Sequence, residues 1–288
     1  MNEETPSTNE EKKLLELLDR ITARSKERYE HRLALLKEKR IVDGKEEWNV
    51  YNSGVREHFE RGGHWTTFNG IGGYTEQSIK DEMEKRRNAL HAAGKKLLVV
   101  EHFGQGRVGT ELEADKVIVS GLTQFSGAPA NVEQVVGDAL DDASEKEMEE
   151  KIRSAQANGY SLQLVIFRPV GGLSLNSQNV YAFRKLYAQL RTAYELLDED
   201  GLMFVGAFGS NLEMTLLQDM FKATGYQRLL LDKSGKDAIG IRKRSSVGTE
   251  LPTEIEWARK HKLLFRILLG LDVHDAQSLM QPRPRIGR

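Results

Sequence analysis

The sequence predicts an α/β fold with a doubly wound, mostly parallel sheet that ends in a C-terminal antiparallel hairpin, plus helical additions at both ends. From Lys96 onward, short apolar runs alternate with segments of helical periodicity, a pattern typical of a parallel sheet covered by helices on both faces. The last two apolar runs are separated only by a short glycine-containing turn near Gly235. Such a connection joins antiparallel neighbours, because parallel strands need a long crossover. A chain of 288 residues with 39% hydrophobic content also has enough apolar material for a substantial core.

The N-terminal region, residues 1–74, precedes this alternation. It opens with the stretch MNEETPSTNEEKK, which is too acidic and polar for a secretory signal and which we expect to be a disordered lead-in. From about Glu10 to Arg40, leucines recur at helical spacing among many charges, which predicts one long charged helix or two in succession. This helix either packs on its own domain or binds a protein partner as a coiled coil. A loop rich in glycine and aromatic residues then runs to Tyr74.

The central domain, residues 75–244, contains the alternating pattern. We expect a helix from Thr75 to Gly94, where glycine provides a good C-cap, and later helices over 144–158, 179–197 and 212–223. The parallel strands are expected at 96–103, 116–122, 134–139, 162–167 and 202–208, and the final hairpin pairs 226–232 with 238–243. The central runs lack polar alternation, as strands buried on both faces do.

The C-terminal region, residues 245–288, is expected to contain one further helix and a basic tail. Thr253 and Glu256 have the spacing of a capping box at a helix start. The tail, QPRPRIGR, is interpreted as solvated, with binding to an acidic or nucleic-acid partner as the alternative.

Composition excludes several classes of function. Charged residues make up 30% of the chain, yet the formal net charge is −1, so nucleic-acid binding is not indicated. No apolar run approaches the length of a membrane span. The absence of cysteine excludes disulfides, thiolate nucleophiles and Cys-ligated zinc. It also fits an intracellular protein, and we expect a cytoplasmic one with no metal site.

Four segments carry a resemblance to a known family. In chain order they are VVEHFGQG, VVGDA, LQLVIF and YAQLRTAYELLDEDGLMFVGAF. Their order, followed by the final hairpin, resembles the class I S-adenosylmethionine-dependent methyltransferases over roughly Thr75 to Arg244. The resemblance implies a Rossmann-type fold, S-adenosyl-L-methionine as cofactor, and methyl transfer to an acceptor that the sequence does not identify.

The resemblance assigns roles to the loop after the first strand of this domain. Gly104 and Gly106 would let the backbone pass close to the methionine portion of the cofactor. Glu101, at the end of that strand, would orient the loop or accept a hydrogen bond from the ammonium group of the ligand. His102 either acts as a base or is a side chain of the cofactor loop.

The resemblance assigns further contacts to later strands. Asp138 would accept a hydrogen bond from the adenine amino group, with the backbone of Ala139 beside it. Ser120 stands near the position where the family usually has an acid that holds the ribose hydroxyls. Arg168 would pair with a carboxylate of cofactor or substrate, because guanidinium binds such groups bidentately, or would form a structural ion pair.

Two alternatives remain open, because this chain departs from the family pattern. The first glycine of the loop comes one residue late, and the segment RPVGGLS after the fourth strand offers no recognisable catalytic motif. One alternative is therefore an inactive, methyltransferase-like binding or scaffold protein whose terminal helices form the partner surface. The other is an NAD(P)-binding Rossmann protein, since GQGRVG matches G-x-G-x-x-G. Its ribose acid is missing, because Gln124 stands near the expected position.

Overall fold

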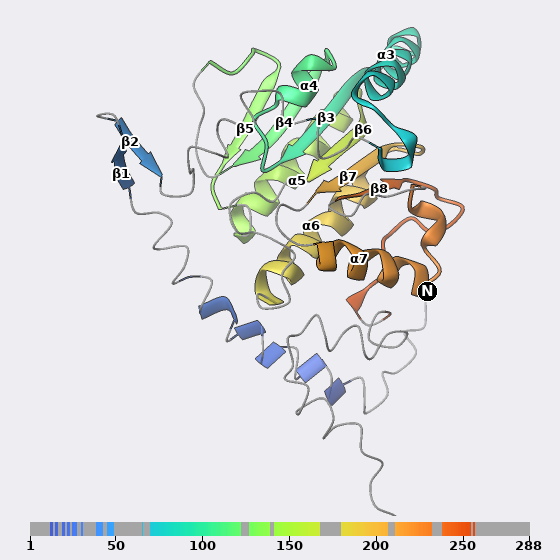
Figure 1. Ribbon diagram of the computed structural model, residues 1–288. Coiled ribbons are helices and arrows are strands. Elements are labelled where there is room, and N and C mark those ends of the chain that lie inside the picture. The colour runs from blue at the N-terminus through green and yellow to red at the C-terminus, as the bar shows by residue number, and fades with distance from the viewer. Residues whose placement is uncertain are drawn as a thin grey trace, which may run out of the picture.

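The computed structural model shows a layered α/β domain with a separate short pair of strands near the N-terminus (Figure 1). The structure describes residues 12–13, 15–16, 19–20, 22–23, 25–27, 30, 39–42, 45–48, 65, 70–121, 127–138, 141–167, 180–206, 211–231, 238–254 and 256.

The N-terminal region contains both helical and extended backbone. Its described positions between 12 and 30 are helical, in agreement with the predicted charged helix. Strands β1 (Lys39–Val42) and β2 (Lys45–Trp48) then form a two-stranded antiparallel sheet. The prediction that the helical region extends to Arg40 is therefore wrong, because Lys39 and Arg40 already pair with β2.

The main sheet has six strands within the described part of the chain, in the order β5-β4-β3-β6-β7-β8. Neighbours are parallel except for β7 and β8, which are antiparallel. This confirms the predicted mostly parallel sheet with a reversed final strand. The strands are β3 (Lys96–His102), β4 (Lys116–Gly121), β5 (Val132–Val136), β6 (Tyr160–Phe167), β7 (Leu202–Gly206) and β8 (Ala238–Arg242). Strand β5 thus begins and ends earlier than the predicted run 134–139.

Helices cover both faces of the sheet (Figure 1). Alternate residues of β3 point to opposite faces, so Leu97 and Val99 pack with one set of helices, and Leu98 and Val100 with the other. The first set comprises α3 (Glu76–Ala92) and α4 (Arg107–Glu111). The second set comprises α5 (Asp142–Ala157), α6 (Val180–Leu196) and α7 (Asn211–Ala223).

Local signals at the helix starts are confirmed. The side chain of Thr75 accepts a hydrogen bond from the N–H of Ser78, and the Ser78 hydroxyl accepts one from the N–H of Thr75, which starts α3. The N–H of Thr253 likewise donates to Glu256, whose own N–H donates to Thr253 Oγ1 at 3.2 Å. This reciprocal pair is the predicted capping box.

The final hairpin differs from its prediction in its first arm. Residues 226–231 do not form a strand; they contain a short 3-10 turn, η2 (Gln227–Leu229), that buries Leu229 in the core. Leu230 then forms an isolated antiparallel bridge with Ile241, and the N–H of Leu231 donates to the carbonyl of Gly240 at 2.8 Å. The chain therefore still reverses direction beside β8, although the pairing is reduced to a bridge.

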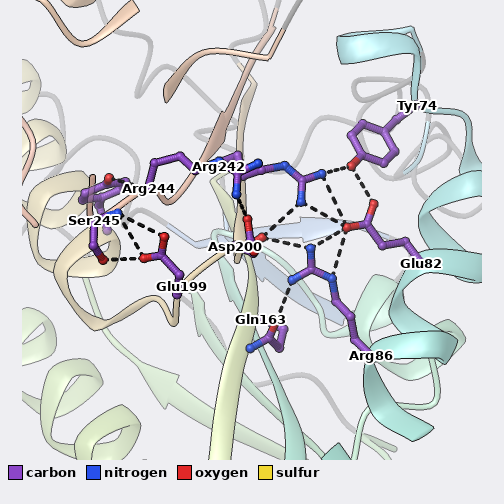
Figure 2. A network of polar contacts seen from close by, with 10 residues as sticks. Tyr74, Glu82, Arg86, Gln163, Glu199, Asp200, Arg242, Arg244 and Ser245 are labelled. Carbon is purple, nitrogen blue, oxygen red and sulfur yellow. Dashed lines mark hydrogen bonds and ion pairs between the residues drawn. The ribbon is translucent and has the colours of Figure 1, made fainter. Parts of the chain in front are cut away.

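The amino ends of β6 and β7 carry a network of polar side chains (Figure 2). Arg86, on α3, donates to Glu82 at 2.5 Å, to Gln163 Oε1 at 2.6 Å and to the carbonyl of Asp200 at 2.9 Å. Tyr74 donates to the other carboxylate oxygen of Glu82 at 2.5 Å. Together with Arg242 of β8, which contacts Tyr74 and Glu82, these groups join α3 to three strands.

Within the described residues, no helix combines the length and the apolar character needed to cross a membrane.

Candidate functional site

The strand order of the sheet determines where a ligand site is expected. Reading outward from β3, the order runs to β4 and β5 on one side, and to β6, β7 and β8 on the other. Open parallel sheets of this kind bind ligands beyond the carboxyl ends of the strands, at the point where the order reverses. That point lies between β3 and β6, and the segment Phe103–Gly106 follows β3 directly there.

Glu101 orients the loop after β3. Its side chain is fully buried, and Oε1 accepts a hydrogen bond from the N–H of Gly109 at 2.8 Å. A Cβ atom at Gly104 would lie 2.7 Å from Oε2 of the same carboxylate. Glu101 and Gly104 therefore depend on each other, since the carboxylate occupies the space that a side chain at 104 would need.

Gly106 and Gly109 must be glycine for two different physical reasons. Gly106 has φ +74, in the left-handed region that favours glycine, and it is the residue before α4. A Cβ at Gly109 would lie 2.6 Å from a methyl group of Val117, so this glycine lets α4 pack directly on β4. The role of Gly109 was not predicted, although it is the third glycine of G-x-G-x-x-G, where close packing of helix on strand is expected.

Ser120 lies inside the protein, between the ends of β3 and β4. It is 3% exposed, and its Oγ accepts a long hydrogen bond, 3.4 Å, from the N–H of Phe103. Phe103 has φ +61, which a residue with a side chain rarely adopts. Ser120 thus supports the bend after β3, and its hydroxyl is directed to the interior.

His102 is a buried and neutral residue of this site. Its ring stacks on that of Phe167 with 4.1 Å between centroids and 9° between planes. Burial lowers the pKa of His102 to about 3, because the charged form cannot be solvated there. Its Nδ1 lies 3.5 Å from Ser120 Oγ, while its Nε2 has no hydrogen-bond partner among the residues that the structure describes.

The remaining predicted residues are placed only in part. Asp138 is partly buried directly after β5, and its carbonyl accepts a hydrogen bond from the N–H of Asp141. Ala139 and Arg168 lie outside the described residues. The structure brings together four of the predicted residues at the carboxyl ends of β3 and β4 and in the loop after β3, namely Glu101, Gly104, Gly106 and Ser120. Their roles toward a cofactor stay predictions.

No metal site is seen among the described residues, since none of their histidine, aspartate and glutamate side chains gather in groups of three or more.

The comparisons with known proteins concern the fold. No protein-family model matches the chain, and no curated protein matches it significantly. Among solved structures, it is similar to the MycE methyltransferase of the mycinamycin biosynthetic pathway, in complex with Mg, SAH and mycinamycin VI, at 11% identity and a TM-score of 0.35. The match covers 69% of this chain and 60% of the MycE chain.

A second similar structure is the N-methyltransferase NodS from Bradyrhizobium japonicum WM9, in complex with S-adenosyl-L-homocysteine. The identity is 12% and the TM-score 0.30, over 71% of this chain and 100% of NodS. The mostly parallel sheet with its reversed final strand β8 is the arrangement that the sequence predicts. This six-stranded topology agrees with a class I methyltransferase-like fold.

Proposed function

We propose that the chain binds S-adenosyl-L-methionine at the carboxyl edge of its sheet and transfers the methyl group to an acceptor. The observation that carries the proposal is the position of the bend after β3, which lies where the strand order reverses. Ligands of open α/β sheets bind at this point.

The residues at the bend fit a ligand that lies close to the backbone. Gly104 is partly exposed and Gln105 exposed, and the carboxylate of Glu101 keeps position 104 free of a side chain. When bound, the cofactor supplies an electrophilic methyl group on a sulfonium centre. Gly104 and Gly106 would lie along its methionine portion, and Asp138 with Ala139 would hold the adenine. Arg168 would pair with a carboxylate of cofactor or substrate.

A second candidate is a methyltransferase-like binding protein without catalytic activity. Ser120 favours it, because the residue near the end of β4 is neutral and is directed toward His102 and Phe103. A ribose contact at this position would be weaker than one from a carboxylate. The partner surface would then lie on the terminal regions.

Isothermal titration calorimetry of the full chain with S-adenosyl-L-homocysteine tests cofactor binding. We expect binding in the micromolar range, weakened at least tenfold by Asp138→Ala. Asp219→Ala, which removes an exposed carboxylate that pairs with Lys222 on α7, is the matched control and should leave the affinity unchanged. Absence of binding at millimolar ligand would contradict the proposal, and binding of NAD instead would favour a dinucleotide protein.

Methyl transfer from labelled cofactor to components of a cell extract then separates the two candidates. Labelled product supports the enzyme. Tight cofactor binding without any labelled product over long incubation supports the binding protein.

A further inference from the structure

The N-terminal helix, whose described positions lie between 12 and 30, packs on its own domain along one face. Leu15 is partly buried against the core on the side of the sheet that α5, α6 and α7 cover. Asp19, Thr22 and Lys26 follow at helical spacing, which places them on the same side of the helix as Leu15. Each of these three residues contacts a side chain of α6. The helix is therefore docked on the start of α6.

Ser25 supplies a hydrogen-bond acceptor to the first turn of α6. This helix starts at Val180, so the N–H of Tyr181 is one of the first four, which have no carbonyl partner inside their own helix. Ser25 Oγ accepts a hydrogen bond from this N–H at 2.9 Å and donates to the carbonyl of Thr22 at 3.0 Å. Such an acceptor usually comes from the residue directly before a helix. Here it comes from a different helix, and Ser25 is only 6% exposed.

Arg184, one turn further along α6, adds a second set of contacts. Its Nη1 donates to Asp19 Oδ1 at 2.9 Å and to Thr22 Oγ1 at 3.1 Å. Its Nε and Nη2 donate to the two carboxylate oxygens of Glu254 at 2.9 and 2.8 Å. The pair with Asp19 is exposed and contributes little by itself, whereas the bidentate pair with Glu254 fixes the guanidinium in position. The N-terminal helix and the segment before Glu256 thus contact the same guanidinium of α6.

The same turn of α6 is linked to the start of α5 and to Asp138. Because α6 follows β6 in the chain and crosses back over the sheet, its first turn lies at the carboxyl edge, where the ligand site is expected. Lys185 pairs with Asp142, the first residue of α5. The N–H of Asp141, directly before it, donates to the carbonyl of Asp138 at 2.9 Å. Contacts between described residues therefore run from the N-terminal helix through α6 to Asp138.

We propose that the N-terminal helix is a strap that holds the first turn of α6 and, through it, the start of α5 beside Asp138, so that docking of the strap and binding of a ligand at Asp138 stabilise each other. The part that concerns the ligand rests on the proposed function. Thermodynamic linkage makes the two effects reciprocal. A change that loosens the strap weakens ligand binding, and the bound ligand holds the strap more firmly by the same factor.

Amide hydrogen exchange of the full chain, followed by NMR without ligand, tests the strap. The amide of Tyr181 should be protected in the parent chain. Ser25→Ala removes its acceptor, so this amide should exchange about tenfold faster in the variant. Ser154→Ala, which removes a hydroxyl at an exposed position of α5, is the matched control and should exchange as the parent chain does. Equal exchange of Tyr181 in the parent chain and in Ser25→Ala would overturn the proposal.

Trypsin cleavage after Arg20 gives a second measure of strap docking. Arg20 is an exposed residue of the N-terminal helix, and cleavage there requires the helix to open locally. Ser25→Ala and Arg184→Met should both accelerate this cleavage about fivefold, while Arg153→Met on α5 should not. If Arg184→Met does not fold, Ser25→Ala alone still decides the result. Cleavage of Ser25→Ala at the rate of the parent chain would overturn the proposal.

Calorimetry with S-adenosyl-L-homocysteine tests the link between the strap and the ligand. Ser25→Ala should weaken the affinity about fivefold, and saturating ligand should slow Tyr181 exchange in the parent chain by a similar factor. Ser154→Ala should bind as the parent chain does, and unchanged affinity in Ser25→Ala would overturn the link.

Failure of the proposed function gives a different result from failure of the strap. If the parent chain does not bind the ligand at millimolar concentration, the proposed function and the link to Asp138 are both overturned. The exchange and cleavage rates measured without ligand still decide whether the strap holds the first turn of α6. Ligand binding with normal affinity in a variant whose strap is loosened would overturn the link alone and leave the proposed function standing.

Discussion

The two edges of the main sheet differ in how well their polar groups are satisfied. At the amino edge, Arg86 serves a carboxylate, an amide and a backbone carbonyl at once. At the carboxyl edge, His102 has a buried nitrogen without a partner among the described residues, and Phe103 has a positive φ. Strain and unsatisfied groups persist only where the surrounding structure holds them, and they concentrate at functional sites. We therefore expect the amino edge to contribute mainly to the stability of the fold and the carboxyl edge to bind ligands.

The largest effect is expected from breaking the amino-edge network with Arg86→Met. Glu82 and Gln163 would lose the hydrogen-bond donor that they share. Water can replace it only poorly, because the side chains of Arg86 and Glu82 are only 16% and 24% exposed. We expect the free energy of unfolding to fall by about 3 kcal/mol, because a poorly solvated carboxylate loses its main partner. Urea denaturation measures the loss.

The control for this variant is Arg153→Met, which removes an exposed ion pair with Glu149 on α5. It should change stability by less than about 0.5 kcal/mol. Cofactor affinity should be unchanged in Arg86→Met. A variant that keeps its stability but loses cofactor binding would reverse the roles of the two edges.

The next effect is expected at the carboxyl edge, from Gly109→Ala. Its new methyl group would lie 2.6 Å from Val117, so α4 must move away from β4. Overpacking of this kind costs about 2 kcal/mol, and the shift of α4 would also weaken cofactor binding through the Glu101 contact. Thermal unfolding and calorimetry measure the two changes.

Two further variants separate steric from backbone effects at this glycine. Gly94→Ala also introduces a methyl group, but with φ +70 and no neighbour within 4 Å, so it should cost only about 1 kcal/mol. Val117→Ala combined with Gly109→Ala should recover cofactor affinity. If the double variant binds as weakly as the single one, close packing is not the reason for the glycine.

The sheet was predictable because its strands are local, continuous apolar runs. Runs such as Leu97–Val100 predict buried parallel strands from their residues alone, and the short final turn predicts the reversed strand β8. The β1–β2 pair was missed, although Asp43-Gly44 between its strands is a hairpin signal. The residues around this dipeptide are mostly charged and directly follow a predicted helix, so the hairpin signal was not recognised.

The site was less predictable, since its features depend on contacts between distant segments. The burial of His102 requires Phe167, which is far away in the sequence and stacks on it from β6. The orientation of Ser120 depends on Phe103, whose positive φ no residue pattern indicates. Glycine spacing located the loop, and the third glycine of G-x-G-x-x-G, Gly109, was also the available signal for the packing of α4 on β4.

Lowering the pH should reduce the stability of the folded chain through His102, at the carboxyl edge. The pKa of this residue is about 3 in the folded chain and about 6.5 in an unfolded one. Below pH 6.5 the unfolded chain therefore takes up a proton that the folded chain does not, and stability falls as the pH falls. His102 should account for a loss of about 2 kcal/mol between pH 7 and pH 5.

Stability curves of the parent chain and of His102→Phe over this range measure that contribution as the difference in slope. Direct NMR titration of the imidazole checks the cause, because the ring should stay neutral down to pH 5. A ring that protonates near pH 6 in the folded chain would contradict the burial argument.

The smallest effect is expected from Tyr74→Phe at the amino edge. This change removes the hydrogen bond to Glu82 and should cost about 1 kcal/mol at neutral pH. Burial, followed by the bond to Glu82, raises the pKa of Tyr74 to about 12, above the value of about 10 for an unfolded chain. Its contribution is therefore complete below pH 10 and is lost as the pH rises toward 12, where the unfolded chain has already released the phenol proton.

Denaturation at pH 8 and pH 11 should show the parent chain and Tyr74→Phe converging in stability as the pH rises. The matched control is Tyr160→Phe, at the amino end of β6, because this variant also removes one phenol hydroxyl but leaves the Glu82 contact intact. It should keep a constant difference from the parent between the two pH values. If only Tyr74→Phe converges in stability with the parent chain, the amino-edge network accounts for the loss of stability at alkaline pH. The loss at acid pH is expected instead from His102, at the opposite edge.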